Sequence, residues 1–597
     1  MTMHRTILCA ALLLSLPSLA FAERGFQAAD LVSMDRYSSP VLSPNGRQVV
    51  FARRVVDMDA NKASSSLWIE DLFARDALPP KRLTPEGWNV NSPAFSADGK
   101  SVYFLSGKSG RSQLYSIALD GGEPVQVTDF ALDIDAYSLS PDGKRIAFAA
   151  SAFADCKGDM DCSRNRLDAT PKASGVVYDR MFIRHWDTWA NGSLNRIFTA
   201  AIDGKSPVKA ATLVGADLIA DVPSKPFGDL SDLAWAPDGK SLVVSARLSN
   251  GDEPTSTNFD LYRIAADGSG KATRAIADGS IGSFSIAGPS AVFTRNSMKS
   301  GNQVVAGGID GEPERAITPS ASEMLPDVAF GKYEQFSFKG WNGDTVHGYV
   351  VKPWNYQEGK TYPVAFLIHG GPQGSFGDGW SYRWNPQTYA GQGYAVVMID
   401  FHGSTGYGQA FTDAISQHWG DRPLEDLQKG WASAQQQYAF LDGANACALG
   451  ASYGGYMVYW IAGNWHTPES GAWKCLVDHD GVFDNRMMGY ATEELWFSEW
   501  ENGGTPYDNP EGYEKFNPIN HVKEWRVPML VVHGQHDYRI PVEQGIAAFT
   551  ALQRQGIESK FLYFPDENHW VLKPANSLLW HDTVNAWLGA HIGAGAR

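Results

Sequence analysis

The chain has little positive charge for its size. Its 597 residues carry 50 lysines and arginines against 66 aspartates and glutamates, which gives a formal net charge of -16 at pH 7. A nucleic-acid partner requires a basic surface to neutralise its phosphates, so this balance argues against nucleic-acid binding. Beyond the amino terminus, no uncharged apolar stretch is long enough to span a bilayer. We therefore expect no membrane insertion by the mature chain.

The amino terminus has the pattern of a secretory signal. Arg5 precedes an apolar stretch over residues 7–19, and residues 20–22 supply the small-residue pattern of a cleavage site. A retained membrane anchor is the alternative, but the stretch is short and contains Pro17. We assign residues 1–22 to a signal peptide and expect a periplasmic or secreted protein.

Cysteine is scarce: the chain has five, and Cys9 leaves with the signal. Cys156 and Cys162 bracket a polar loop, where an oxidising compartment favours a local disulfide. Metal ligation is the rival, but no histidine partner lies at zinc-finger spacing. Cys447 and Cys475 are expected on strands that can neighbour one another. We interpret them as buried small hydrophobic residues and leave their redox state open.

The first half of the chain repeats one pattern. A chain this long exceeds one ordinary core, so two large domains are expected. Over residues 39–325, β-forming runs are closed by Asn-Gly or Asp-Gly, which supply the positive φ angles of tight hairpins. The pattern occurs at residues 43–47, 96–100, 140–144 and 236–240, with a looser second set at 120–121, 203–204, 267–268 and 310–311.

The spacing of this pattern predicts a β-propeller. The glycines at 46, 99, 143 and 239 are separated by 53, 44 and 96 residues, and we interpret the last interval as two periods. A period of roughly 45 residues is typical of four-stranded blades around an axis. We predict a propeller of about seven blades over residues 23–330. A β-sandwich is the alternative, which the regular period disfavours.

The second half follows a different pattern. From about Tyr333, apolar strand-like runs such as residues 363–368 and 394–399 alternate with helical stretches. This alternation indicates a mainly parallel sheet covered by helices. We predict an α/β-hydrolase domain over residues 331–597.

A nucleophile motif lies within this second half. Ser452 stands in Gly450-Ala451-Ser452-Tyr453-Gly454, directly after an apolar run, where glycines let the backbone turn sharply and expose the serine. Such a string alone can mark an ordinary turn. Asp537 and His569 each follow a further strand-like run, in the order Ser, Asp, His of an α/β-hydrolase triad. Because a serine hydroxyl needs a base and an orienting carboxylate, we predict that these three residues are catalytic.

Two backbone donors complete the predicted catalytic site. The N-H of Tyr453 follows the nucleophile, and Gly371 lies in a His-Gly-Gly-Pro segment after an early strand. A plain strand-exit turn is the alternative for that segment. The histidines that compete for the base role, His533, His536 and His479, are interpreted as packing or supporting residues. A glycine-rich loop at residues 403–408 lacks a lysine at phosphate-loop spacing, so nucleotide binding is not expected.

Together, these motifs and the sequence Asp537-Tyr538-Arg539-Ile540-Pro541 closely resemble the prolyl oligopeptidase family of serine peptidases. The resemblance covers nearly all of the mature chain and is strongest to the acylaminoacyl-peptidase and dipeptidyl-peptidase V branch. It implies release of amino-terminal dipeptides from short peptides, with a propeller that excludes folded proteins. It implies neither a metal nor an organic cofactor.

The resemblance also implies how the substrate is held. Arg539 matches a position that faces substrate carbonyl groups, with a loop-holding salt bridge as the alternative. A free α-amino group needs an acid, and the candidates are Glu493, Glu494 and Asp187. We place Glu493 among the substrate-binding residues and expect the aromatic pair Trp496-Phe497 to line the pocket before the cleaved bond. Which acid holds the amine stays open.

Three other functions remain possible at this point. An acylaminoacyl-peptidase would act on blocked amino termini, and a carboxylesterase would use the same hydrolase domain. A propeller-based binding protein with an inactive hydrolase is the third, although Ser452, Asp537 and His569 are all present. The side-chain preference and the choice between monomer and homodimer are left open.

Overall fold

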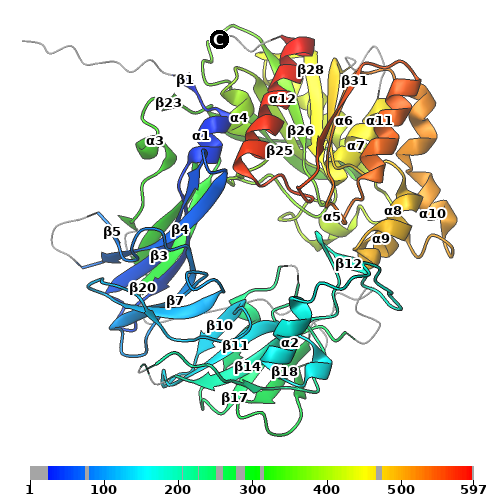
Figure 1. Cartoon of the computed structure of the whole chain (residues 1–597). Coiled ribbons are helices and arrows are strands. Elements are labelled where there is room, and N and C mark those ends of the chain that lie inside the picture. Colours follow the sequence, from blue (N-terminus) through cyan, green and yellow to red (C-terminus); the bar gives the residue numbers. More distant parts are fainter. Residues whose placement is uncertain are drawn as a thin grey trace, which may run out of the picture.

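The protein is described by a computed structural model that covers two lobes (Figure 1). The described residues are 24–73, 79–202, 204, 206–225, 227–249, 260–276, 290–308, 315–465 and 473–593. The predicted signal peptide at 1–22 lies outside them, as do Asp203 and the Asp310-Gly311 turn. No described helix combines the length and apolar composition needed to cross a membrane.

The first lobe consists of small antiparallel sheets arranged in an arc (Figure 1). Five sheets of three or four strands are formed by the described residues of this lobe, and each resembles a propeller blade. Their strands are β2 (Arg36–Leu42), β3 (Gln48–Asp57), β4 (Lys62–Asp71) and β5 (Lys81–Arg82); β6 (Val90–Phe95), β7 (Ser101–Ser106), β8 (Gln113–Ala118) and β9 (Val125–Gln126); β10 (Ala136–Leu139), β11 (Arg145–Ala152), β14 (Leu194–Ala201) and β15 (Thr212–Leu213); β16 (Leu233–Trp235), β17 (Ser241–Ala246), β18 (Asp260–Ala265) and β19 (Thr273–Ile276); and β20 (Ser290–Ser297), β21 (Ser300–Gly308) and β22 (Arg315–Ala316).

The repeated turn forms these hairpins as predicted. In the first one, the Gly46 N-H donates to the carbonyl of Ser43, and Gly46 adopts a φ of 67°. The Ser43 hydroxyl donates to Asn45 Oδ1 at 2.7 Å and accepts the N-H of Gln48 at 2.9 Å. The serine hydroxyl therefore hydrogen-bonds the backbone within the turn, and Gly46 adopts the left-handed conformation that the turn requires.

The predicted count of about seven blades is not confirmed by the described residues. The 96-residue interval between Gly143 and Gly239 is one period rather than two, because it contains β11, β14 and β15 of one blade-like sheet and then β16, the first strand of the next. Its extra length is an insertion at residues 153–193, between β11 and β14. The described part of the chain thus supports five sheets and gives no support to seven. In the sequence, an insertion of about one period in length looks the same as a repeat that has lost its turn pattern.

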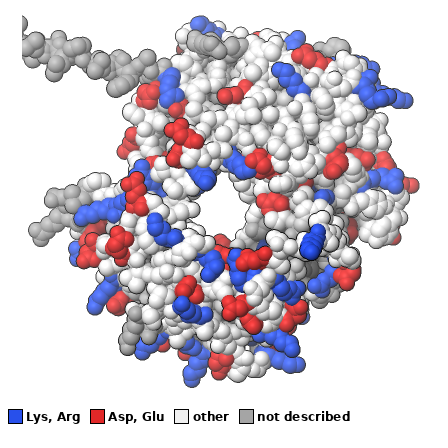
Figure 2. Space-filling view, in the orientation of Figure 1, with Lys and Arg blue, Asp and Glu red and all other residues white. Residues whose placement is uncertain are grey.

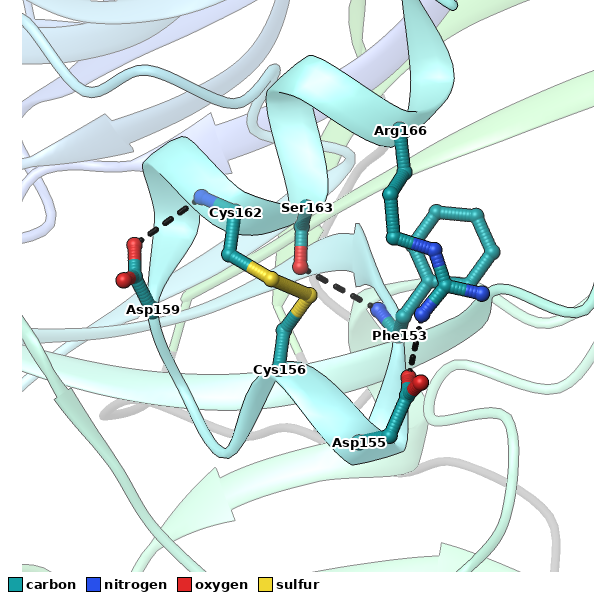
Figure 3. The surroundings of a disulfide bond; sticks show 7 residues. All are labelled: Phe153, Asp155, Cys156, Asp159, Cys162, Ser163 and Arg166. Carbon is teal, nitrogen blue, oxygen red and sulfur yellow. Dashed lines mark hydrogen bonds and ion pairs between the residues drawn. A yellow bond between two sulfur atoms is a disulfide. The ribbon is translucent and has the colours of Figure 1, made fainter.

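The insertion is stabilised by the predicted disulfide. Cys156 and Cys162 are bonded, with Cα atoms 5.8 Å apart (Figure 3). Asp159 Oδ1 caps the helix α2 (Met160–Leu167) by accepting the N-H of Cys162 at 3.0 Å. On the other side, the Arg166 guanidinium lies 3.8 Å above the ring of Phe153. The disulfide and these contacts hold a short polar helix that has little apolar surface of its own.

The second lobe contains one eight-stranded sheet with helices on both faces. Its strand order is β24 (Tyr333–Lys339), β25 (Thr345–Val351), β27 (Ala395–Asp400), β26 (Tyr362–Ile368), β28 (Leu441–Ala451), β29 (Cys475–His479), β30 (Met529–Gly534) and β31 (Ser559–Phe564). The six strands from β27 to β31 are parallel. This is the α/β architecture predicted for the second half.

Alternate residues of the central strands enter two separate cores. Phe366 packs on one side with α6 (Arg422–Gln437), α7 (Tyr453–Asn464) and α11 (Glu543–Arg554). Leu367 packs on the other side with α4 (Pro386–Ala390) and α12 (Pro574–Ile592). Both side chains are fully buried, which explains the continuous apolar runs in the sequence.

Cys447 and Cys475, whose redox state the sequence left open, form a disulfide. They are direct partners in the register of β28 and β29, with Cα atoms 4.8 Å apart. Both are fully buried. Neighbouring parallel strands bring two side chains of the same face together, so the sequence spacing of 28 residues gave no sign of the contact.

The two lobes meet in two regions (Figure 1). Near the amino terminus, the Gln27 amide donates to the carbonyl of Gly391 at 3.0 Å. On the opposite side, a hairpin of the insertion contacts the second lobe through Arg184, which donates to the carbonyl of Ala491 at 2.9 Å. Figure 2 shows an opening between the lobes.

Candidate active site

Ser452 occupies a sharp turn between β28 and α7. Its φ of 59° and ψ of -121° are unusual for a residue with a side chain. A Cβ on Gly450 would collide with the backbone of Gly454, and one on Gly454 would collide with the carbonyl of Ile368. The close approach therefore requires glycine at both positions. The predicted nucleophile elbow is present.

Asp537 and His569 come together as the sequence order predicts. They follow the neighbouring strands β30 and β31, and the Nδ1-H of His569 donates to Asp537 Oδ2 at 2.7 Å. Asp537 Oδ1 accepts the N-H of Ile540 at 2.9 Å. With Nδ1 protonated, Nε2 of His569 is left as the acceptor. Ser452 and His569 line the same cavity of about 460 Å³.

The other histidines are placed away from the base role. His533 is fully buried and its Nε2-H donates to the carbonyl of Ile540 at 2.8 Å. His479 is also buried, and burial holds its pKa well below the ordinary value. His536 is exposed, so it is not a packing residue as we had interpreted it.

The loop that carries Gly371 borders the cavity and is held from several sides. Gly371 and Tyr453 both line the cavity, and Gly371 has a φ of 122°. The Gln373 amide donates to Glu501 Oε1 at 2.7 Å, and Glu501 also accepts the indole N-H of Trp419 at 2.6 Å. Glu501 is buried and lies in α9 (Leu495–Asn502). The sequence gave no signal for this contact, because a glutamate on a helix ordinarily faces solvent.

Arg539 lies at the wall of the same cavity, next to two glutamates. Its Nη2 is 3.0 Å from Glu493 Oε1 and is also paired with Glu494. The Glu493 side chain has no exposed surface and contacts His185 Nε2 at 3.1 Å. Burial would raise the pKa of Glu493, but the hydrogen bond with His185 and the charge of Arg539 lower it.

Glu494, rather than Glu493, lines the cavity. Burial raises the pKa of Glu494 to about 7. Our placement of Glu493 as a direct substrate contact is therefore corrected: it supports Arg539 from behind. Trp496 is corrected in the same way. Its neighbour Phe497 lines the cavity instead. Trp496 packs edge-to-face against Phe497, with ring centroids 5.7 Å apart.

The first lobe contributes an aromatic residue that the sequence did not identify. Trp186 joins the strands β12 (Arg184–His185) and β13 (Thr188–Trp189) and is 8% exposed. Its ring centroid lies 5.9 Å from that of His569, edge-to-face, and Arg539 Cζ lies 4.8 Å from it. The hairpin of the insertion thus contacts both the base and the cavity arginine. Asp187, a candidate for the amine, instead accepts the Asn568 amide at 2.8 Å.

A second carboxylate, Asp480, also faces His569. It is 1% exposed, and its Oδ2 lies 3.5 Å from His569 Nδ1. Asp480, Asp537 and His569 are the one group in the described chain that offers three metal-ligand atoms within 4.8 Å of one another. Nδ1 of His569 already donates to Asp537, and Asp480 Oδ1 accepts the Ser452 N-H. Because internal hydrogen bonds use these atoms, the group does not fit a metal site.

Comparison with known proteins identifies the family. The sequence profile of the prolyl oligopeptidase family matches residues 380–595, a segment that includes Ser452, Asp537 and His569. The second lobe is thus similar in sequence to the prolyl oligopeptidase family. A second profile, the dipeptidyl peptidase IV N-terminal region, matches residues 57–153 in the first lobe. The predicted family is thereby confirmed.

Curated relatives align over almost the whole chain. A probable dipeptidyl-peptidase 5 of Aspergillus clavatus is 29% identical, covering 94% of this chain and 94% of its own length. A dipeptidyl-peptidase 5 of Porphyromonas endodontalis is 28% identical, covering 94% of this chain and 93% of its own length. Among solved structures, the acylaminoacyl peptidase of Pyrococcus horikoshii has a TM-score of 0.76 at 17% identity, covering 96% of this chain and 98% of its own. This last likeness shows a shared fold.

Proposed function

We propose that the protein is a serine exopeptidase that releases amino-terminal dipeptides from short peptides through an acyl-enzyme. Ser452 is the nucleophile, His569 the base and Asp537 the residue that orients its ring. The backbone N-H groups of Tyr453 and Gly371 are the oxyanion donors. The family and the names of the full-length relatives support this proposal, together with the 2.7 Å His569–Asp537 contact beside the Ser452 elbow.

The reaction follows from the positions of the protons. Nε2 of His569 takes the hydroxyl proton as Ser452 Oγ attacks the carbonyl carbon of the second residue. The tetrahedral oxyanion is stabilised by the two backbone donors, and Asp537 stabilises the imidazolium that forms. His569 then returns the proton to the leaving amine, which departs as the shortened peptide. Water attacks the remaining ester with His569 again as base, and the dipeptide is released.

The observation that carries dipeptide release is the acid at the cavity wall. Glu494 lies in the same cavity as Ser452, next to Arg539. Two glutamates face one guanidinium here, so an incoming ammonium group finds an excess of negative charge. We place the substrate α-amino group at Glu494, its carbonyl oxygens at Arg539, and the side chain of the second residue against Phe497. A carboxylate at a fixed separation from the nucleophile selects the length of the released fragment.

The first lobe limits access in this proposal. We assign residues 23–330 to a β-propeller lobe and residues 331–597 to the peptidase domain, with the site between them. The insertion hairpin places Trp186 against His569 and Arg539, two residues that line the cavity, and this disfavours folded proteins as substrates. The two disulfides, one in each lobe, support an exported, periplasmic or secreted protein, because such bonds persist in oxidising compartments.

The test compares one dipeptide chromogenic substrate with its Nα-acetylated counterpart on the purified mature protein. We expect turnover of the free-amine substrate, and loss of this turnover in Ser452→Ala. Faster cleavage of the acetylated substrate would instead assign an acylaminoacyl-peptidase. Hydrolysis of esters without hydrolysis of either peptide would assign an esterase.

A further inference from the structure

Asp480 connects the nucleophile with the base. It directly follows β29, the strand between β28, which ends before Ser452, and β30, which ends before Asp537. Asp480 Oδ1 accepts the Ser452 N-H at 2.8 Å, and its Oδ2 lies 3.5 Å from His569 Nδ1. One buried carboxyl group therefore contacts the backbone of the elbow and approaches the same ring nitrogen that Asp537 binds.

The backbone of Asp480 adopts an energetically unfavourable conformation. Asp480 has a φ of 45°, in the left-handed region that residues with a Cβ rarely adopt. Its N-H donates to the carbonyl of Val532 at 2.9 Å, which fixes the conformation from β30. Such positions persist where the surrounding structure maintains them, and they cluster at functional sites. The strain places the carboxyl group toward His569.

Asp480 shares its surroundings with other ionisable groups. Asp478 and His479 lie on β29 itself, Asp537 and His569 follow β30 and β31, and Arg383 precedes α4. Burial raises the pKa of Asp480 well above its usual range, and the nearby charge of Asp537 raises it further. Two carboxyl groups beside one ring thus favour one charged and one protonated member.

We propose that Asp480 is a reserve positioning residue for His569: its carboxylate accepts the Nδ1-H when Asp537 is unable to. This inference rests on the triad of the proposed function. In the intact protein Asp537 binds the ring and Asp480 secures the elbow. When the Asp537 carboxylate is removed, burial still raises the pKa of Asp480, but the added repulsion from Asp537 disappears. Asp480 then ionises more readily, 3.5 Å from the nitrogen that has lost its acceptor.

The experiment measures how fast a fluorophosphonate labels Ser452, in parallel with kcat on the dipeptide substrate. Four variants are compared: Asp537→Ala, Asp480→Asn, the double variant, and the control Asp478→Asn. Alanine is used at 537 because an asparagine amide would donate to Nδ1 and impose the wrong tautomer, a change that costs about 10⁴-fold in a triad. Asp478 is equally buried on β29, but it accepts the Tyr459 hydroxyl at 2.6 Å instead of approaching His569.

We expect labelling to fall about 100-fold in Asp537→Ala, about 3-fold in Asp480→Asn and about 10⁴-fold in the double variant, where no carboxylate faces the ring. The Asp537→Ala rate should rise with pH as Asp480 ionises, beyond any rise seen in the double variant. A merely structural role for Asp480 would not produce that pH limb. Asp478→Asn should keep the wild-type pH profile.

Equal rates and equal pH profiles in Asp537→Ala and the double variant would overturn the proposal. Melting temperatures of all variants identify any loss of folding, and Asp480→Ser replaces Asp480→Asn if the latter unfolds. Labelling of Ser452 without dipeptide release would contradict the proposed function while leaving the role of Asp480 measurable. No labelling of the wild-type protein would overturn both.

Discussion

The two lobes show opposite relations between sequence pattern and site. In the second lobe, Ser452, Asp537 and His569 each lie within five residues of the end of a parallel strand, where local patterns predict them. In the first lobe, the regular hairpins form the framework, and Trp186, which contacts both His569 and Arg539, lies in the irregular insertion at 153–193. The difference teaches that the part of a repeat lobe which breaks the period is the part to search for function.

The largest effect should come from the second lobe. Ser452→Ala removes the nucleophile and should lower kcat by about 10⁶-fold, leaving substrate binding in place. Steady-state kinetics with the dipeptide substrate measures this loss. Ser433→Ala on the outer helix α6 is the matched control and should retain full activity. A Ser452→Ala protein with substantial peptidase activity would show that the nucleophile lies outside this lobe.

The next effect tests whether the insertion belongs to the site. Trp186→Ala removes the ring that packs against His569 and beneath Arg539, and kcat/KM should fall about 100-fold because both groups lose their positions. Trp189→Ala on the same hairpin is the comparison. Trp189 donates its indole N-H to the Tyr538 hydroxyl at 2.9 Å and should matter less. Equal activity of both variants and the wild type would show that the insertion has a structural role and does not position the site.

A smaller effect concerns the cavity acid. Glu494→Gln should lower kcat/KM for a free-amine dipeptide substrate about 10-fold near neutral pH and leave the acetylated substrate unchanged. Burial raises the pKa of Glu494 to about 7, so the carboxylate that holds the ammonium is present above this pH and lost below it. The ratio of kcat/KM for the free and acetylated substrates should therefore fall as pH drops through about 7. A ratio that is independent of pH would place the amine elsewhere.

The smallest effect should come from the disulfide of the insertion. Replacing Cys156 and Cys162 by serine opens a loop with a sequence separation of 6, which should lower the melting temperature by no more than about 3 °C. Activity should stay within about 2-fold. Replacing Cys447 and Cys475 opens a separation of 28 inside the sheet and should destabilise more. The reverse order, measured by thermal unfolding, would make the insertion the more critical structure.

The fold was predictable where local chemistry repeats. Asn-Gly and Asp-Gly turns determine a hairpin wherever they occur, and uninterrupted apolar runs determine a strand covered on both faces. The blade count was not predictable, because an insertion of 41 residues between β11 and β14 has nearly the length of one period. Length alone does not distinguish an inserted segment from a degenerate repeat.

The site was predictable to the extent that each residue carries a motif. Asp480 follows a strand just as Asp537 does, but it stands beside Asp478 and His479, and no sequence pattern selects one of three adjacent ionisable residues. The choice between Glu493 and Glu494 depends on which way the backbone turns before α9. Trp186 contacts His569 from a distant segment of the chain, so no local sequence pattern predicts the contact. Long-range packing decides these cases.

The contact between the insertion hairpin and the histidine loop also bears on when the enzyme becomes active. Asp187 and Asn568, which flank Trp186 and His569, are 381 residues apart in the chain. Contacts at such separation form late in folding, after the local hairpins and the sheet have been made. A chain still emerging from synthesis lacks the completed substrate site. The site is therefore complete only after the insertion of the first lobe has packed against the histidine loop of the second.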